Sequence, residues 1–174
     1  MKGAMALCLK ELVVDKFGEE KWLESLTCAK IIDEPILTPM SDLDDDILMR
    51  ILDSVCLTAR IPKDIVIDSF GEYWVTVFAN RLYNAHYSGM KNAKDFLLKL
   101  DGIHEHVSKH MKNAMPPRFT YEKIKPNKLL ITYLSSRNLM DIFIGLIKGV
   151  GTYFSEKLKI VQIDEIHVEV TFQY

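Results

Sequence analysis

The feature that most constrains the fold is a change in hydrophobic spacing at Pro116 and Pro117. Before this pair, apolar residues recur every three or four positions, which predicts amphipathic helices. After it, apolar and polar residues alternate, which predicts strands, with one further helical stretch at 139–154. The strands are expected at 119–124, 128–133, 159–163 and 166–172. The sequence therefore predicts an α+β protein with an antiparallel C-terminal sheet.

Helical stretches are expected at 1–17, 19–27, 42–59, 62–78 and 92–113. Gly18 ends the first, Ser41 is the expected N-cap of the third, and Pro116 and Pro117 are expected to stop the last. A calcium loop is a poorer interpretation of the acidic run at 42–46, because the required Gly and distal Glu are missing. We expect a single domain over 1–174, in which a helical N-terminal subdomain (1–60) packs on a helix-and-sheet subdomain (61–174).

Composition and charge exclude several classes of protein. The formal net charge of −2 gives no reason to expect nucleic-acid binding. The longest apolar run, 139–150, contains Asp141 and Lys148 and is shorter than the roughly 20 residues that span a bilayer, so no membrane segment is expected. We recognise no secretory signal. Three widely spaced cysteines, Cys8, Cys28 and Cys56, suit free thiols in a reducing compartment, so a cytoplasmic protein is expected.

His104 is the first candidate for chemistry. It lies on the apolar stripe of the predicted helix 92–113, four residues after Leu100 and three before Val107, and should point inward. A histidine held by a rigid helix in an apolar wall is a suitable axial ligand for heme iron. A hydrogen-bonded core histidine is the more common role at such a position, and spacing alone favours it.

Two further histidines on this helix, His106 and His110, have the i, i+4 spacing of a zinc-binding pair. No third ligand is evident near them in the sequence. They are expected to be an exposed pair on a different face of the helix from His104.

The second candidate is the set Tyr133, Ser135 and Arg137, which follow one another at two-residue intervals as a strand runs out toward a helix. Two hydroxyls and a guanidinium on one side would suit the propionates of a heme. A strand-end arginine is also commonly just solvated. Pro117 is either a simple helix stop or a rigid ring placed to press on a flat cofactor.

Together these features resemble the heme nitric oxide/oxygen-binding (H-NOX) family along nearly the whole chain. The resemblance is carried by Met1-Lys2-Gly3, Gly18-Glu19-Glu20-Lys21-Trp22, Phe70-Gly71-Glu72-Tyr73-Trp74, Leu100-Asp101-Gly102-Ile103-His104, Pro116-Pro117-Arg118 and Tyr133-x-Ser135-x-Arg137. It implies the H-NOX fold enclosing heme b, with His104 as iron ligand, Tyr133, Ser135 and Arg137 on the propionates, and Pro117 distorting the heme. It also implies a distal pocket formed by Met5, Leu9, Trp74, Phe78, Ile142 and Leu146.

The resemblance also implies a function. The chain is similar to stand-alone bacterial sensors and to the heme domain of soluble guanylate cyclase, so a gas sensor is expected and not an enzyme. Dioxygen-binding members carry a tyrosine where this chain has Ile142, so nitric oxide and carbon monoxide are the expected ligands and dioxygen is excluded. The indole N–H of Trp74 could donate a hydrogen bond to dioxygen if it turned toward the iron, although packing against the porphyrin edge is the simpler role for this ring. Nitric oxide is expected to weaken the bond between iron and His104 and to shift the N-terminal subdomain, with output to a separate sensor histidine kinase or cyclic-di-GMP enzyme.

Two other classes stay open from the sequence. A heme enzyme of the peroxidase type would need a distal acid or base, which the expected apolar pocket lacks. A heme-free interaction module, with His104 as a core residue, would be colourless when purified.

Overall fold

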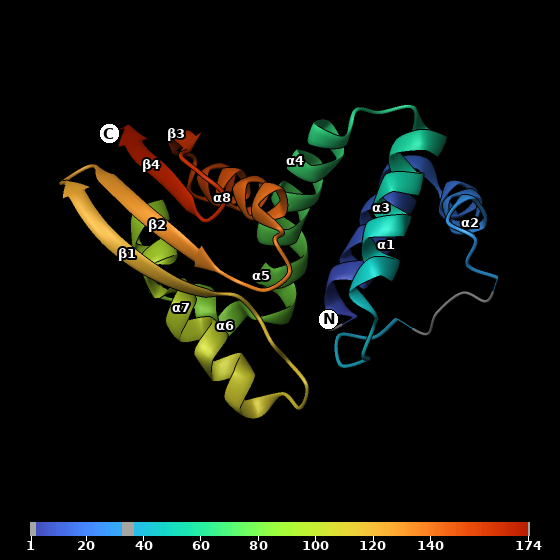
Figure 1. The fold of residues 1–174 in the computed structure, drawn as a ribbon, viewed down its shortest axis with the longest axis horizontal. Helices are drawn as coiled ribbons and strands as arrows, with labels where there is room; N and C mark the ends of the chain where they lie inside the picture. The colour runs from blue at the N-terminus through green and yellow to red at the C-terminus, as the bar shows by residue number, and fades with distance from the viewer. Residues whose placement is uncertain (1–2, 33–36, 174) are drawn as a thin grey trace. The chain divides into compact units, whose positions relative to one another are not determined.

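The computed structural model describes residues 3–32 and 37–173. Met1 and Lys2, the start of the opening motif, lie outside the described residues. The chain divides into two compact units, Met1–Phe70 and Gly71–Tyr174, and each is described by itself. Figure 1 traces the order of the elements within each unit.

The first unit is helical. It contains α1 (Ala4–Phe17), α2 (Glu19–Cys28), α3 (Asp45–Ala59) and the start of α4 (Lys63–Tyr73). Gly18 separates α1 from α2 with a φ of +87°, a left-handed value that residues with a Cβ rarely adopt, so the expected break is confirmed. Buried side chains from all three complete helices, among them Leu9, Trp22 and Leu52, fill the core of this unit.

The expected N-cap of α3 is wrong. The helix begins at Asp45 with Asp44 at the N-cap. Ser41 is instead part of a local turn, in which its hydroxyl donates to the Thr38 carbonyl at 2.9 Å and accepts from the Thr38 amide at 3.1 Å. Serine hydroxyls compete for nearby backbone groups in this way, which takes Ser41 away from the helix.

The second unit combines helices with a sheet. The helix expected to run from Pro62 to Phe78 is interrupted, because α4 passes at Trp74 into a π-helical turn, which the sequence pattern did not indicate. The remaining elements are η1 (Trp74–Phe78), α5 (Ala79–Leu82), α6 (Asn84–Tyr87), α7 (Ala93–His110), β1 (Arg118–Lys125), β2 (Lys128–Leu134), α8 (Met140–Phe154), β3 (Lys157–Gln162) and β4 (His167–Gln173).

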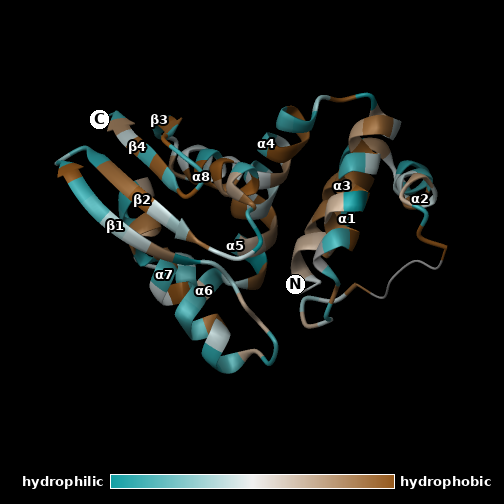
Figure 2. Ribbon diagram, viewed as in Figure 1, coloured by the Kyte–Doolittle hydropathy of each residue, from teal (hydrophilic) through white to brown (hydrophobic). Residues whose placement is uncertain are grey.

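The four strands form one antiparallel sheet in the order β1-β2-β4-β3. The expected alternation is confirmed, and Figure 2 shows hydrophobic residues recurring along the strands. Ile166, expected to begin the last strand, precedes β4 and is 42% exposed, in a turn whose amides bond to Asp164. The inner face is formed by Phe119, Leu129, Ile131, Tyr133, Val168, Val170 and Phe172.

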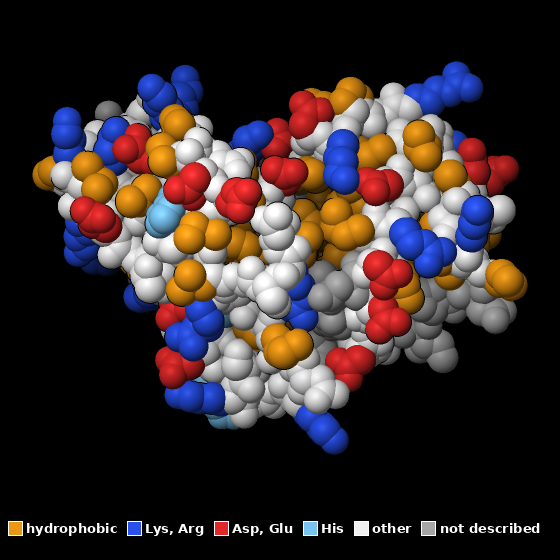
Figure 3. Space-filling view, in the orientation of Figure 1, with side chains coloured by type: hydrophobic (Ala, Val, Ile, Leu, Met, Phe, Trp, Pro, Cys, Tyr) orange, Lys and Arg blue, Asp and Glu red, His pale blue; other side chains and the backbone are white. Residues whose placement is uncertain are grey.

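Helices α7 and α8 cover the inner face of the sheet (Figure 1). The backbone of α8 also lies directly against that of α4: a Cβ on Gly149 would meet the Gly71 carbonyl oxygen at 2.3 Å, so only glycine fits there. On the face of this unit seen in Figure 3, basic, acidic and hydrophobic side chains are interspersed.

Helix α7 is shorter than expected. It ends at His110, and Asn113 in the turn that follows has a φ of +60°. Asparagine tolerates this left-handed conformation, which turns the chain away before Pro116 is reached. The prolines therefore follow the end of the helix and do not cause it.

Candidate functional site

His104 lies on α7, and its ring is held by the segment that follows the helix. Its Nδ1 is 2.8 Å from the carbonyl oxygen of Pro117. A carbonyl oxygen can only accept a hydrogen bond, so Nδ1 carries the proton and donates. Nε2 then keeps its lone pair, and it has no hydrogen-bond partner among the described residues. The imidazole thus offers one free nitrogen ligand.

The surroundings of His104 favour its neutral form. Burial lowers the pKa of His104 below its usual value, because a charged ring is poorly solvated there. The hydrogen bond to Pro117 and the negative charge of Asp101 raise this pKa and offset the effect only in part. A neutral imidazole is the form that binds metals.

A row of aromatic rings runs from His104 across the sheet. The His104 and Phe119 ring centroids are 5.3 Å apart, Phe119 stacks on Phe143 at 4.8 Å, and Phe143 stacks on Tyr133 at 5.4 Å. Phe119, Phe143 and Tyr133 are all buried. The row joins the predicted iron ligand to a predicted propionate-binding residue through an apolar region.

The Tyr133 hydroxyl belongs to a buried residue and has no hydrogen-bond partner among the residues that the structure describes. Tyr133 is only 4% exposed, and its hydroxyl makes no hydrogen bond to any described residue. Leaving a buried donor unsatisfied costs about 1–3 kcal/mol. The hydroxyl is therefore available for an acceptor on a bound molecule.

Ser135 and Arg137 lie beyond the end of β2, which stops at Leu134. The expected two-residue alternation of a strand therefore does not extend to them. A turn brings them together instead, because the Arg137 amide donates to Ser135 Oγ at 3.2 Å. The Arg137 guanidinium also donates to the carbonyl of Met115, which ties it to the segment containing Pro117.

The residues predicted for the distal pocket lie on three elements. Trp74 and Phe78 belong to η1 and stack with ring centroids 5.3 Å apart, and η1 packs against α8. Ile142 and Leu146 lie one turn apart on α8. Met5 and Leu9 lie one turn apart on α1, in the other unit. That all six line one pocket stays a prediction.

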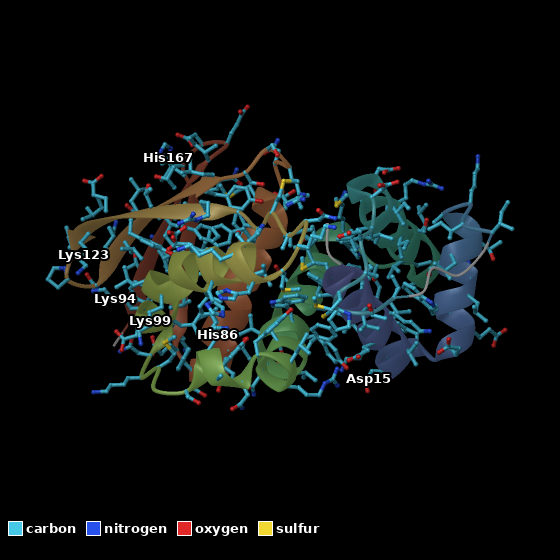
Figure 4. The ribbon with its side chains drawn as sticks, turned by 90° about the horizontal axis from the view of Figure 1, so that it is seen from below. Asp15, His86, Lys94, Lys99, Lys123 and His167 are labelled. Atoms are coloured by element: carbon cyan, nitrogen blue, oxygen red, sulfur yellow. The ribbon has the colours of Figure 1, made fainter. Side chains whose placement is uncertain are left out.

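His106 and His110 are both exposed, as expected for a pair on the outer face of α7. Their rings stack at 4.0 Å, and the ring of His86 from α6 lies 5.8 Å from that of His106. Figure 4 shows His86 and His167 on opposite sides of the sheet. Within the described part of the chain, no three His, Cys, Asp or Glu side chains are arranged to hold a metal ion.

The sequence analysis gave no role to the residues that bond around Pro117. Asp101 accepts from Arg118 Nε and Nη2, each at 2.7 Å, and from the Phe119 amide at 2.8 Å. These bonds, with that of Arg118 the strongest, lower the pKa of Asp101 to about 2. The available signal was a carboxylate three residues before His104, which is one helical turn away.

The residues present fit a heme. A neutral imidazole with a free Nε2 suits the axial position of an iron, and an unsatisfied buried Tyr133 hydroxyl suits a carboxylate. The guanidinium of Arg137 adds a positive charge in the same segment of chain. Aromatic and aliphatic side chains between these groups suit a flat apolar macrocycle.

Comparisons with known proteins agree with this geometry. The model of the haem-NO-binding family (HNOB) matches residues 2–162. The soluble guanylate cyclases gcy-34 and gcy-32 of Caenorhabditis elegans are 28% and 29% identical to the chain over 159 residues. The matches cover 87% of this chain and 23% of each cyclase, so the chain spans about a quarter of the length of these relatives.

Solved structures show the same fold. An H-NOX protein from S. oneidensis in the Fe(II)NO ligation state matches over 100% of both chains with a TM-score of 0.88 and 20% identity. An oxygen-binding H-NOX domain related to soluble guanylate cyclases, in its oxygen complex, matches with a TM-score of 0.81 and 24% identity, over 100% of this chain and 96% of that one. Because the family model covers most of the sequence, the chain belongs to the haem-NO-binding family, the H-NOX domains.

Proposed function

We propose that this chain is a heme-based gas sensor that binds nitric oxide and carbon monoxide and excludes dioxygen. The observation that carries the proposal is the state of His104. Its Nδ1 is engaged by the Pro117 carbonyl, and its Nε2 has no hydrogen-bond partner in the described part of the chain. A row of aromatic rings leads from His104 to the Tyr133 hydroxyl, which also makes no hydrogen bond to a described residue. A core histidine with a purely structural role usually has both nitrogens satisfied.

Heme b, when bound, would supply a ferrous iron that takes up a diatomic gas. His104 Nε2 would ligate that iron, because the bond from Nδ1 to the Pro117 carbonyl leaves Nε2 for it. Tyr133, Ser135 and Arg137 would hold the propionates, with the guanidinium providing charge and the hydroxyls neutral hydrogen bonds. Pro117 would press its rigid ring on the macrocycle.

Gas selectivity follows from the side chains assigned to the distal side. Ile142, Leu146 and Phe78 have no polar hydrogen, so a polarised ligand such as dioxygen gains no hydrogen bond from them. Nitric oxide binds ferrous heme strongly without such a donor. The likeness to an oxygen complex and to an Fe(II)NO form extends to the fold alone, so the proposed selectivity rests on Ile142.

The same side chains argue against catalysis. A peroxidase needs a distal group that gives and takes a proton. Phe78, Ile142 and Leu146 do neither. We therefore expect the heme-loaded protein to turn over hydrogen peroxide no faster than free heme does.

The output is proposed to be a conformational change that acts on a separate protein, either a sensor histidine kinase or a cyclic-di-GMP enzyme. Release of His104 by nitric oxide would free α7 to move relative to the Pro117 segment. No helix among the described residues is long and apolar enough to cross a membrane. We propose a cytoplasmic location.

The absorption spectrum of the reduced protein tests the proposal. It is recorded under argon, then in air, then with nitric oxide, for the parent, His104→Ala and His110→Ala. His110 is the matched control, because it is an exposed histidine on the same helix. We expect a Soret band that is absent in His104→Ala and present in His110→Ala. The band should stay at the same wavelength in air and shift with nitric oxide. A colourless protein that takes up no added heme would instead indicate an interaction module.

A further inference from the structure

The carboxylate of Asp101 holds the chain segment that positions His104. Its two oxygens accept from both Nε and Nη2 of Arg118, each at 2.7 Å, in a bidentate pair. Oδ1 also accepts from the Phe119 amide at 2.8 Å. One side chain on α7 thus bonds to the two residues that directly follow Pro117.

These bonds restrict the carbonyl that receives the His104 proton. The Pro117 carbonyl and the Arg118 amide share one planar peptide unit, so its orientation depends on how Arg118 is held. Asp101 bonds to the side chain of Arg118 and to the next amide along the chain. Rotation of the peptide unit would break these bonds or the 2.8 Å bond from His104 Nδ1.

The same bonds reach the strand that carries Tyr133. Phe119 is the register partner of Tyr133 in the β1–β2 pair, and Phe119 and Tyr133 both pack near Phe143. The Tyr121 hydroxyl adds a further link, since it accepts from the Asp101 amide at 3.2 Å. The helix bearing the iron ligand and the strand bearing a propionate residue are therefore tied at Asp101.

We propose that Asp101 is the positioning residue for His104: through Arg118 and Phe119 it fixes the Pro117 carbonyl, which keeps His104 in its Nδ1–H tautomer and sets the strength of the bond from Nε2 to iron. The part of this inference that concerns the iron bond rests on the proposed function, whereas the part that concerns the tautomer does not. A hydrogen bond from the outer nitrogen orients a metal-bound histidine and makes it more basic, and its loss commonly lowers metal affinity by about 10–100-fold.

Three variants separate this role from a general loss of stability. Asp101→Asn removes the charge and one arm of the bidentate pair. Arg118→Gln removes the pair and leaves the bond to the Phe119 amide. Glu169→Gln is the matched control, because the Glu169 side chain is paired with Lys128 at 2.6 Å, is 24% exposed against 25% for Asp101, and lies on the outer face of the sheet.

The first readout is the His104 tautomer in the heme-free protein, measured by long-range ¹H–¹⁵N NMR. We expect Nδ1–H in the parent and in Glu169→Gln, and a mixture of tautomers in Asp101→Asn. The second readout is the iron–histidine stretching frequency of the reduced heme protein by resonance Raman spectroscopy. It should fall in both Asp101→Asn and Arg118→Gln and stay unchanged in Glu169→Gln.

An unchanged tautomer and an unchanged frequency in folded Asp101→Asn would overturn the inference. Should Asp101→Asn fail to fold, Arg118→Gln decides with the same two readouts. A parent protein that binds no heme, or binds it without His104, would instead refute the proposed function, and the tautomer measurement would still test the role of Asp101.

Discussion

Helices α7 and α8 cover the same face of the sheet but are attached to it in different ways. Buried residues occur along α8 from Met140 to Gly151, whereas in α7 they are confined to Ala93, Phe96 and Leu97 near its start. The second half of α7 is held by directional bonds from Asp101 and His104 to the Pro117 segment. Apolar packing fixes α8. The part of α7 that bears His104 is held by a few polar bonds, so it can move when one of these bonds is broken.

The largest difference should appear when a core side chain of α8 is removed. Phe143 is buried and stacks on both Phe119 and Tyr133, so Phe143→Ala should lower the free energy of unfolding by about 3–5 kcal/mol. Leu100→Ala, at a half-buried position on α7, should cost clearly less. Urea denaturation of the heme-free protein measures both. Equal losses would contradict the contrast between the helices.

A pair of glycine substitutions sharpens the same contrast. A Cβ on Gly149 of α8 would lie 2.3 Å from the Gly71 carbonyl oxygen, so Gly149→Ala should destabilise the protein by about 1–3 kcal/mol. A Cβ on Gly102 of α7 would meet nothing within 4 Å, so Gly102→Ala should stabilise by about 0.5–1 kcal/mol. The sign of each change in midpoint temperature is the test. Destabilisation by both would mean that α7 is as tightly packed as α8.

A third prediction assigns gas selectivity to α8. In Ile142→Tyr a hydroxyl donor replaces an apolar side chain, and one hydrogen bond of about 0.5–1.5 kcal/mol should raise dioxygen affinity about two- to tenfold. Ile142→Phe is the control, since it adds the ring without the hydroxyl. Oxygen titration of the reduced protein compares them. If the phenylalanine variant gained as much, a hydrogen bond would not be the cause.

The smallest effect concerns the pH dependence of α7. Because burial lowers the pKa of His104 in the folded protein, the unfolded chain takes up a proton first as pH falls below about 6.5. The free energy of unfolding of the heme-free protein should therefore fall between pH 7 and 5.5. The fall should be smaller in His104→Gln. Asp101, with a pKa of about 2, stays ionised throughout this range. Identical pH profiles would show that folding does not lower the pKa of His104.

Much of the fold could be predicted, because local spacing determines it. Alternation identified all four strands, and the apolar stripe of α7 identified His104 as inward-facing. The errors arose where local bonds override spacing: Thr38 engages Ser41, and Asn113 turns the chain before the prolines. The π-helical turn at Trp74 could not be predicted, because its residues have no composition or spacing that distinguishes them from an α-helix.

The site was less predictable than the fold. The family resemblance pointed to His104 and to the Tyr133, Ser135 and Arg137 set, whereas spacing alone favoured a core histidine. The pairing of Asp101 with Arg118 joins residues 17 positions apart, and it depends on how the chain returns from α7 into β1. The carbonyl that accepts from His104 Nδ1 is likewise determined by the path of the chain between α7 and β1.

Heme titration of the heme-free His104→Gly variant, with and without added imidazole, tests the central claim that His104 supplies the axial nitrogen. The account predicts weak binding without imidazole and a restored Soret band at one heme per chain when imidazole occupies the vacated space. Parent-like binding without imidazole would contradict it, because another group would then hold the iron.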